Sequence, residues 1–448
     1  MSEQIEAPPA LNDDEKHYIH SHPASYLLKA LLCECNKDYI YWSKFKYKYK
    51  YKSLDKEDLT PRLLWGYLKE QRKAEGQIID LHPRYKLHLF VTPQMQEQLN
   101  VLDQFLKNEG FIASVIPEKY KPGYLQRVQR AEAYSSSKIE GATTSRDKAE
   151  KILRNDILGG DRSQRMIYNN YVTMSLLLAE CNADMTEDLL LQIHLSMVRG
   201  TLKHTADEGR FRTVEDEVYV EHQLTHEVVH MPPSATELSG FMSFFLALCN
   251  DWGRLAHIHP ILKGIIIHFL MGYMHPFVDG NGRTARALFY WYMLRSGYSL
   301  LKYLSISQKI YESKSKYEKA YLQVEADGFD LGYFIQYHLD VLRSSIEDFK
   351  SNVQKKLKEQ EPITSIQHIK DFNDRQINIL YLFKESNSFE LTEREVVQRF
   401  GVTLATAKSD LKGLVERGFL DEIAYNKVKR GYLKSSRFDE FLEEGLSG

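Results

Sequence analysis

The sequence lacks the features of a membrane, disulfide-stabilised or highly charged protein. Its four cysteines, Cys33, Cys35, Cys181 and Cys249, are too scattered for a disulfide framework, and the first two do not have the spacing of a zinc knuckle. No apolar run reaches the roughly 20 residues of a membrane span. The first residues contain no apolar segment of a signal peptide. We therefore expect a cytoplasmic protein with reduced thiols and no membrane contact.

An excess of one charge is also missing. Lys and Arg total 59 against 61 Asp and Glu, so any contact with nucleic acid must come from a local patch. The hydrophobic content of 43% can fill more than one core, and the length fits roughly two to four domains.

The N-terminal region predicts helices with one short strand element. Residues 1–20 are expected to be a loose polar tail, and residues 60–73 a helix with Pro61 in its first turn. Lysine and aromatic residues alternate over Lys44–Lys52, so on a strand the aromatics would share one face. Such a face could stack on single-stranded nucleic acid. An edge strand whose lysines discourage pairing is the favoured interpretation.

Helical patterns dominate the middle of the chain up to about residue 345. Thr186 is the expected N-cap of one helix, and His194 on its apolar side is expected to be a core histidine with satisfied hydrogen bonds. Between Gly209 and Pro233, valines flank a polar turn and predict a short β-hairpin.

The C-terminal part has its own pattern, which begins after a charged helix-like segment that we expect to end at Pro362. The elements expected next are a helix over Asp374–Lys384, a capping box at Thr392 and Glu395, a break at Gly401, a helix over about residues 404–417 and a strand pair with residues 426–431 at its tip. This order resembles a winged helix. Basic side chains that could contact phosphates are Lys408, Lys412, Arg417, Lys427, Lys429, Arg430 and Lys434. Acidic neighbours dilute this patch, so DNA binding and protein contact are supported about equally.

The residues that carry chemistry lie together in His275-Pro-Phe-Val-Asp-Gly-Asn-Gly-Arg-Thr-Ala-Arg286. An apolar helical run precedes them and helix-forming residues follow, so a tight loop leads into a helix N-terminus. Gly280 and Gly282 allow the backbone N–H groups to approach phosphate oxygens, and the helix dipole favours an anion there. Arg283 and Arg286, three residues apart, could both reach that anion.

A carboxylate and an imidazole flank this anion site. Asp279 would repel an anion unless it held a bridging Mg²⁺, which is the role we expect for it. His275 could take a proton from an attacking hydroxyl group near neutral pH. The loop therefore combines a general base, a metal ligand and an anion site.

This stretch resembles the signature of the Fic family, His-x-Phe-x-(Asp/Glu)-Gly-Asn-Gly-Arg-x-x-Arg, at every fixed position. The resemblance implies transfer of AMP from ATP to a Tyr, Ser or Thr of a protein, with release of pyrophosphate. It implies that His275 is the base, that Asp279 binds Mg²⁺ and that Phe277 packs the loop onto the core. The phosphate-binding residues that it implies are Gly280, Asn281 and Gly282 for the α- and β-phosphates, and Arg283 and Arg286 for the terminal phosphates.

The resemblance covers roughly residues 130–345. Gly209-Arg-Phe-Arg212 and Met231-Pro-Pro233 resemble the frame of the family's hairpin flap. The hairpin would then pair with the backbone of a target protein and present its hydroxyl group to the base. Tyr317 and Tyr321 loosely resemble a tyrosine-rich helix that lines the adenine pocket, although plain core aromatics are the alternative.

Ser136-Ser-Lys-Ile-Glu140-Gly141 resembles the inhibitory helix of Fic proteins, (Ser/Thr)-x-x-x-Glu-(Gly/Asn). This implies that Glu140 pairs with Arg286 and so removes the cation that the γ-phosphate needs. The alternative is a solvated glutamate near a helix end.

We expect a mainly α protein with three folded parts. They are an N-terminal helical region with a short strand element (1–105), a Fic-type helical core with the inhibitory helix and a β-hairpin flap (106–348), and, after a linker (349–364), a winged-helix module (365–448). The expected activity is ATP- and Mg²⁺-dependent protein adenylylation, inhibited by Glu140. Self-modification and homo-oligomerisation stay open.

Two other functions compete with this one. The first is a DNA-binding regulator whose core only senses nucleotide, which would not need the base His275. The second is transfer of another phosphate-containing group, although a lysine in place of Gly282 would have pointed to phosphate transfer. The expected partners are ATP, an unidentified target protein, and DNA or protein at the winged helix.

Overall fold

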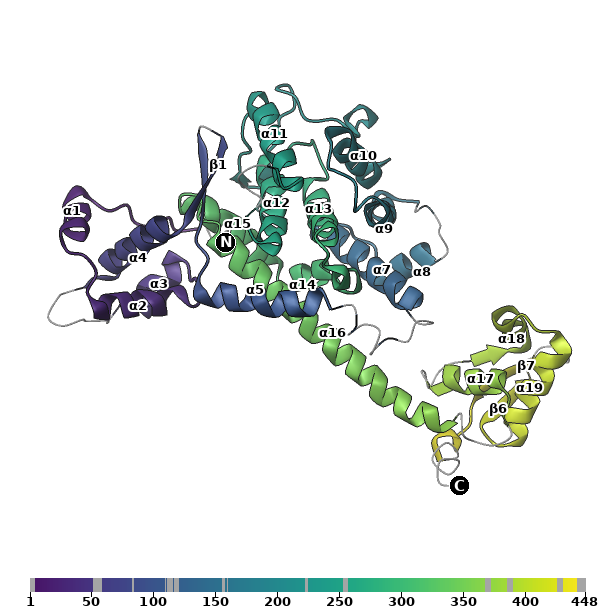
Figure 1. Cartoon of the computed structure of the whole chain (residues 1–448). Helices are drawn as coiled ribbons and strands as arrows, with labels where there is room; N and C mark the ends of the chain where they lie inside the picture. Colours follow the sequence, from purple (N-terminus) through teal and green to yellow (C-terminus); the bar gives the residue numbers. More distant parts are fainter. Residues whose placement is uncertain are drawn as a thin grey trace. The chain divides into compact units, whose positions relative to one another are not determined.

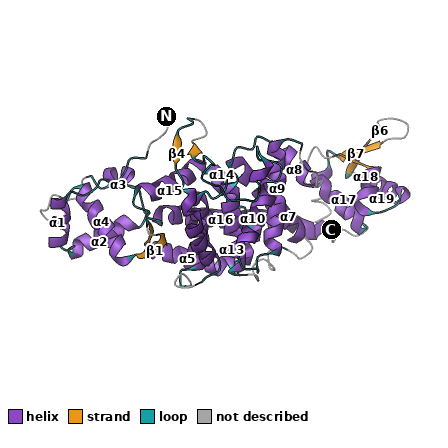
Figure 2. Cartoon of the chain, turned by 90° about the horizontal axis from the view of Figure 1, so that it is seen from above, coloured by secondary structure: helices purple, strands orange, loops and turns teal. Residues whose placement is uncertain are grey.

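A computed structural model shows a largely helical chain that divides into two compact units, Met1–Phe349 and Lys350–Gly448 (Figure 1). The described residues are 5–50, 59–82, 84–108, 110, 116, 121–154, 158, 160–221, 225–252, 257–366, 372–384, 390–424 and 430–440. Among these residues, the strands form two short pairs and one small sheet, which confirms the mainly α class (Figure 2). Within the described ranges, no helix is both long and apolar enough to cross a lipid bilayer.

The N-terminal helices are α1 (Asp13–Ser21), α2 (Tyr26–Asn36), α3 (Trp42–Lys48) and α4 (Pro61–Glu75), and the last confirms the helix predicted over residues 60–73. The prediction of a loose tail over residues 1–20 is wrong, because α1 occupies its second half. The side chain of Asn12 accepts from the backbone N–H of Glu15, whose carboxylate accepts in return from the N–H of Asn12. These two hydrogen bonds form a capping box that stabilises the start of α1, although the polar composition of this stretch did not predict a helix.

The strand predicted over Lys44–Lys52 is also wrong, because residues up to Lys48 form α3. The aromatics Trp42, Phe45 and Tyr49 follow a helical spacing and are buried, whereas Tyr47 is 71% exposed. Trp42 and Phe45 pack against Trp65 of α4, and Tyr49 packs against Phe45. In so short a run, aromatics spaced for one face of a strand partly coincide with aromatics spaced for one face of a helix. Burial of this segment against α4 favours the helix. With these rings buried, Tyr47 is the one exposed aromatic among the described residues of this segment, so the predicted face of aligned aromatics is not formed there; residues 51 and 52 lie outside the described ranges.

The strand element of the N-terminal region lies later in the chain than predicted. Strands β1 (Gln77–His82) and β2 (Tyr85–Leu89) form an antiparallel hairpin, and α5 (Pro93–Leu106) follows it. His88 pairs with Asp330, which joins the hairpin to the helical core.

The core of the first unit is formed by two buried helices, α12 (Pro260–Met274) and α13 (Asn281–Arg295), which pack against each other. The elements around them are α7 (Lys121–Ile139), α8 (Arg146–Arg154), α9 (Arg162–Ala179), α10 (Glu187–Val198), α11 (Leu238–Cys249), η5 (Ser299–Tyr303), α14 (Ile306–Glu312) and α15 (Lys314–Ala326). Thr186 caps α10 as predicted. The predicted flap is present as β3 (Val220–Glu221) paired with β4 (Val228–His230).

The C-terminal unit is entered through α16 (Gly332–Ile366), which continues past Pro362 instead of ending there as predicted. The elements that follow are α17 (Asp374–Lys384), β5 (Glu390–Thr392), α18 (Glu393–Phe400), α19 (Leu404–Glu416), β6 (Leu420–Ala424) and β7 (Arg430–Lys434). The capping box at Thr392 and the break at Gly401 are confirmed, and Gly401 ends α18 in the left-handed region. Strand β5 was not predicted; it pairs with β7 in a sheet of order β5-β7-β6. The order of the elements agrees with the predicted order, and the assignment as a winged helix stays a prediction.

Most of the described cations of the predicted basic patch lie against carboxylates. The pairs are Lys408 with Glu393, Lys412 with Glu416, Arg430 with Glu422 and Lys434 with Asp439. Arg417 lies over the ring of Phe372. Lys427 and Lys429 lie outside the described residues. DNA or protein contact through this unit stays a prediction.

Candidate active site

The loop between α12 and α13 has the geometry expected of an anion site. His275 ends α12 in the left-handed region, with φ of 46°, and Gly280 precedes α13 with φ of 87°. The N-cap residue Gly280 has no side chain, and no side chain of the described residues caps the first backbone N–H groups of α13. A helix N-terminus in this state attracts anions.

Asn281 shapes the loop from within. Its buried side chain accepts from the backbone N–H of Phe277, at 3.0 Å, and donates to the carbonyl oxygen of Phe277, at 2.8 Å. The amide therefore closes the turn between the two helices. Its predicted contact with phosphate would come from the backbone.

The contacts of His275 leave one ring nitrogen available as a base. Its Nδ1 lies 2.7 Å from the carbonyl oxygen of Gly272, which can only accept, so Nδ1 carries the proton and Nε2 has the lone pair. Burial lowers the pKa of His275 to about 4, and the charges of His230 and Arg212 act in the same direction. The imidazole is therefore neutral near pH 7.

Arg212, from the motif Gly209-Arg-Phe-Arg212, holds the loop that carries His275. Its guanidinium group donates to the carbonyl oxygens of His275, at 2.7 Å, of Met274, at 3.2 Å, and of Pro233. Its backbone N–H donates to the carbonyl oxygen of Pro276, at 2.8 Å. Since Pro233 lies just after β4, one side chain joins the end of the flap to the base.

His194 supports the other side of the loop. Its Nδ1 accepts from the N–H of Gly209, so Nε2 donates to the carbonyl oxygen of Asp279, at 2.9 Å. Its ring stacks on Phe277 with centroids 3.7 Å apart. Burial lowers the pKa of His194 to about 4. The prediction of a core histidine with satisfied hydrogen bonds is confirmed, and its position also fixes the loop.

The two arginines of the motif are buried and keep unused donors. Arg283 is 1% exposed and Arg286 is 3% exposed. Among the described residues, Nε and Nη2 of Arg283 and Nη1 of Arg286 have no hydrogen-bond acceptor. Buried guanidinium groups without acceptors are costly, which indicates that an anion belongs beside them.

Glu140 provides a carboxylate at this place. Its Oε1 accepts from Nη2 of Arg286, at 2.9 Å, and Ser136 contributes its hydroxyl and carbonyl oxygens as further acceptors for Arg286. A Cβ atom on Gly282 would overlap the carboxylate, so Glu140 lies against the first turn of α13. Burial tends to raise the pKa of Glu140, but Arg286 and then Arg283 hold it below its usual value. Gly141, with φ of 88°, then turns the chain away.

Asp279 lies at the edge of the loop with its side chain 40% exposed. Its Oδ2 accepts from Nη2 of Arg162, at 2.9 Å, and Arg162 Nε donates to the carbonyl oxygen of Thr201. Sequence reasoning missed Arg162, which is 117 residues away and belongs to no motif. No group of three or more His, Cys, Asp or Glu side chains within the described ranges could hold a metal. A cation at Asp279 would need phosphate or water oxygens as its other ligands, which suits Mg²⁺.

Tyr317 of α15 lies close enough to Arg286 to interact with its charge. Its hydroxyl group lies 2.9 Å from Nε2 of His268 and 3.5 Å from the hydroxyl group of Tyr321. Burial raises the pKa of Tyr317, and the charge of Arg286 opposes this effect. The role of Tyr317 in adenine binding stays a prediction.

The site combines a buried helix pair, a turn with the geometry of an anion site, a neutral imidazole and a flap. Residues 184–293 match the Fic/DOC family, so the chain contains a Fic-type domain. This confirms the family inferred from the motif.

Curated relatives carry the name Protein adenylyltransferase Fic. The protein from Nematostella vectensis is 28% identical over 222 residues, which cover 45% of this chain and 46% of the relative. The protein from Culex quinquefasciatus is 30% identical over 242 residues, covering 51% and 42%. The chain thus spans less than half the length of these relatives. A solved Fic family protein from Desulfovibrio desulfuricans has a TM-score of 0.49 at 20% identity, covering 76% of this chain and 96% of that chain.

Proposed function

We propose that the chain is a protein adenylyltransferase that transfers AMP from ATP to a hydroxyl group of a target protein and is inhibited by its own Glu140. One observation carries the proposal: at the N-terminus of α13, two buried arginines with unused donors surround a carboxylate. A phosphate group has the same charge sign and the same acceptor chemistry as that carboxylate. The names of the curated relatives support the reaction.

In the proposed reaction, the hydroxyl oxygen of the target attacks the α-phosphorus of ATP. The bond from that phosphorus to the oxygen that bridges the α- and β-phosphates breaks, and pyrophosphate leaves. Nε2 of His275 takes the proton of the hydroxyl group, because its Nδ1 is already committed to Gly272. Arg283 and the backbone of Gly280 and Gly282 would hold the phosphate chain in line for attack.

Asp279 would hold Mg²⁺ against the phosphates, where the ion would neutralise part of their charge. For this to happen, the carboxylate has to exchange its contact with Arg162 for the ion. Such an exchange costs little, because exposed ion pairs typically contribute about 0–1 kcal/mol.

The flap would bind the target. Strand β4 ends at His230, whose ring centroid lies 6.4 Å from that of His275. A target segment added to this edge by backbone hydrogen bonds would bring a Tyr, Ser or Thr hydroxyl group near Nε2. Target choice would then depend on the exposed flap side chains Tyr219, Val228 and Met231.

The inhibition follows from competition for Arg286. Its Nη2 and Nε are occupied by Glu140 and Ser136, and the Glu140 carboxylate covers the turn where a terminal phosphate would lie. ATP would therefore bind poorly or with its α-phosphate misplaced. Glu140→Gly should release Arg286, while Glu140→Gly with Arg286→Ala should lose that gain.

The test uses ATP that is labelled on the adenine base in one reaction and on the γ-phosphate in another. Wild-type chain, Glu140→Gly, and Glu140→Gly with His275→Ala are each incubated with Mg²⁺, and the label retained on protein is measured. Base label retained by Glu140→Gly, at least tenfold above wild type, and lost again with His275→Ala supports the proposal. Retained γ-label would mean phosphate transfer instead. Equal labelling of wild type and Glu140→Gly would reject the inhibitory role.

A further inference from the structure

A second buried carboxylate lies on the helix that carries Glu140. Glu132 of α7 is 2% exposed, and within the described part of the chain no Lys, Arg or His forms an ion pair with it. Four donors surround it instead. They are the hydroxyl group of Tyr290 at 2.9 Å, the hydroxyl group of Ser305 at 2.9 Å, the backbone N–H of Ser307 at 2.9 Å, and the hydroxyl group of Ser307.

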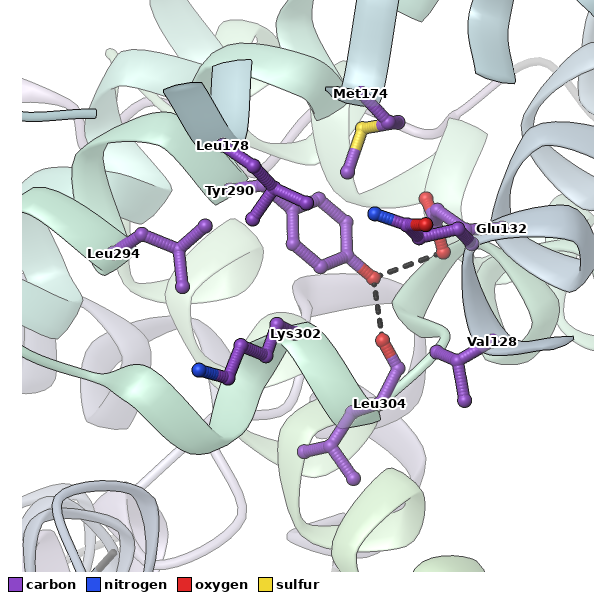
Figure 3. A pocket seen from close by; sticks show the side chains of 9 residues that line it. Val128, Glu132, Met174, Leu178, Tyr290, Leu294, Lys302 and Leu304 are labelled. Carbon is purple, nitrogen blue, oxygen red and sulfur yellow. Dashed lines mark hydrogen bonds between the residues drawn. The ribbon is translucent and has the colours of Figure 1, made fainter. Parts of the chain in front are cut away.

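These donors come from the elements on which α7 rests. Tyr290 lies on α13, Ser305 precedes α14, and Ser307 lies in the first turn of α14. The hydroxyl group of Tyr290 is also within 2.9 Å of the carbonyl oxygen of Leu304 and accepts from the N–H of Ile306. Figure 3 shows Glu132 and Leu304 on either side of this hydroxyl group, at the edge of a small pocket. Glu132 therefore joins α7 to two elements at one point.

The spacing along both helices connects this point to the inhibitory contact. Glu132, Ser136 and Glu140 are four residues apart, so they follow one face of α7 and its C-terminal end. Arg286 and Tyr290 are likewise four apart on α13. Glu132 contacts Tyr290, whereas Ser136 and Glu140 contact Arg286. Two contacts, one turn apart on each helix, fix the register of α7 along α13.

We propose that Glu132 is a positioning residue for inhibition: its contacts with Tyr290 and Ser307 hold α7 in register on α13 and thereby place Glu140 on Arg286. The inference rests on the proposed function, and it deepens the regulation of that site. A slide of α7 by one turn, about 5.4 Å, would break both contacts together. Weakening the Glu132 contact should therefore lower the occupancy of the Glu140 contact.

Two substitutions weaken the contact from opposite sides. Tyr290→Phe removes one donor and keeps the ring. Glu132→Met keeps a similar volume and removes every acceptor, so the N–H of Ser307 loses its partner. Glu132→Met leaves buried donors unpaired and could impair folding. Tyr290→Phe is the milder variant, so the proposal can still be tested if Glu132→Met does not fold.

Tyr298→Phe is the matched control. Tyr298 is also buried, and its hydroxyl group also donates to a carboxylate, that of Asp103 on α5, at 2.6 Å. Its removal should lower thermal stability by an amount similar to that of Tyr290→Phe but should leave α7 in place. A general effect of destabilisation would appear in both tyrosine variants.

Each variant is made with Glu140 present and with Glu140→Gly, and both the affinity for ATP and the transfer of base label are measured. With Glu140 present, Tyr290→Phe and Glu132→Met should raise ATP affinity and labelling by about threefold to tenfold, as expected for loss of a hydrogen bond to a buried carboxylate. Tyr298→Phe should raise neither. With Glu140→Gly, Tyr290→Phe and Glu132→Met should give no further gain, because they act through Glu140.

The outcomes separate this inference from the proposed function. If Glu140→Gly raises ATP affinity and Tyr290→Phe and Glu132→Met do not, the role of Glu132 is refuted while the inhibition stands. The same conclusion follows if Tyr298→Phe activates as strongly as Tyr290→Phe, or if the gains persist fully with Glu140→Gly. If Glu140→Gly itself changes nothing, the proposed inhibition and this inference fail together.

Discussion

The pKa of His275 makes the pH dependence of transfer a sharp test of the proposed base. Burial and the neighbouring charges of His230 and Arg212 lower this pKa to about 4, whereas an unperturbed histidine titrates near about 6.5. The depressed value keeps the base-competent neutral form down to low pH. With a pKa of about 4, about 97% of the imidazole is still neutral at pH 5.5; with a pKa of about 6.5, only about 9% would be.

The assay is the rate of base-label transfer by the Glu140→Gly variant, measured as kcat/KM for ATP between about pH 5 and 8, since this quantity reports groups of the free enzyme. Glu140 itself raises the pKa of His275, so its removal should not move the value upward. Between pH 7.5 and 5.5, kcat/KM should change by less than about twofold. A histidine at about 6.5 would instead cause a loss of about tenfold.

The nucleotide itself also titrates in this pH range. Its contribution is measured as the pH dependence of ATP binding by the His275→Ala variant, and it is then subtracted from the pH profile of kcat/KM. The His275 Cε1–H signal in NMR spectra gives an independent titration, assigned by its absence from His275→Ala. A midpoint near pH 6.5 in both measurements would refute the reasoning from burial.

Further predictions concern the metal site and the buried histidines. Asp279→Ala should abolish Mg²⁺-dependent transfer, and full activity of the wild type in excess chelator would contradict that role. Arg162→Ala should lower the Mg²⁺ concentration at half-maximal activity by up to about fivefold, because an exposed ion pair contributes at most about 1 kcal/mol; an increase in that concentration would contradict the competition. Burial lowers the pKa of His194 to about 4 and that of His338 to about 3, so the unfolded chain binds protons below about pH 6.5 that the folded chain does not. The free energy of unfolding should therefore fall as pH drops from 6.5 to 5. In urea titrations, the slope of this free energy against pH should be shallower by about 1 kcal/mol per pH unit in His338→Leu.

The sequence predicted the active-site loop well because its causes are local. Gly280 needs a positive φ, the residues after it favour a helix, and His275 and Asp279 lie within the same turn. The caps at Thr186 and Thr392 were predictable for the same reason, since each depends on residues within one turn. Local rules also failed where burial decides, as in α3.

The contacts that complete the site could not be predicted in this way. Arg162 reaches Asp279 across 117 residues, and Tyr290 reaches Glu132 across 158. Neither pair has a spacing or motif that distinguishes it from other charged or aromatic residues. The cap of α1 is different, because Asn12 and Glu15 have the spacing of a capping box and could have been recognised.

Arg212 donates hydrogen bonds to both the flap and the residue proposed as the base, and this limits which changes of the flap sequence the domain can tolerate. Because one guanidinium group binds the carbonyl oxygens of Pro233 and His275, a flap of altered length or sequence moves the base unless Pro233 keeps its place. If the flap binds the target as proposed, redesign of target choice should therefore vary flap residues between 214 and 229 and leave both anchor points unchanged. The same constraint predicts that flaps exchanged between Fic domains function only when they are cut outside Arg212 and Pro233.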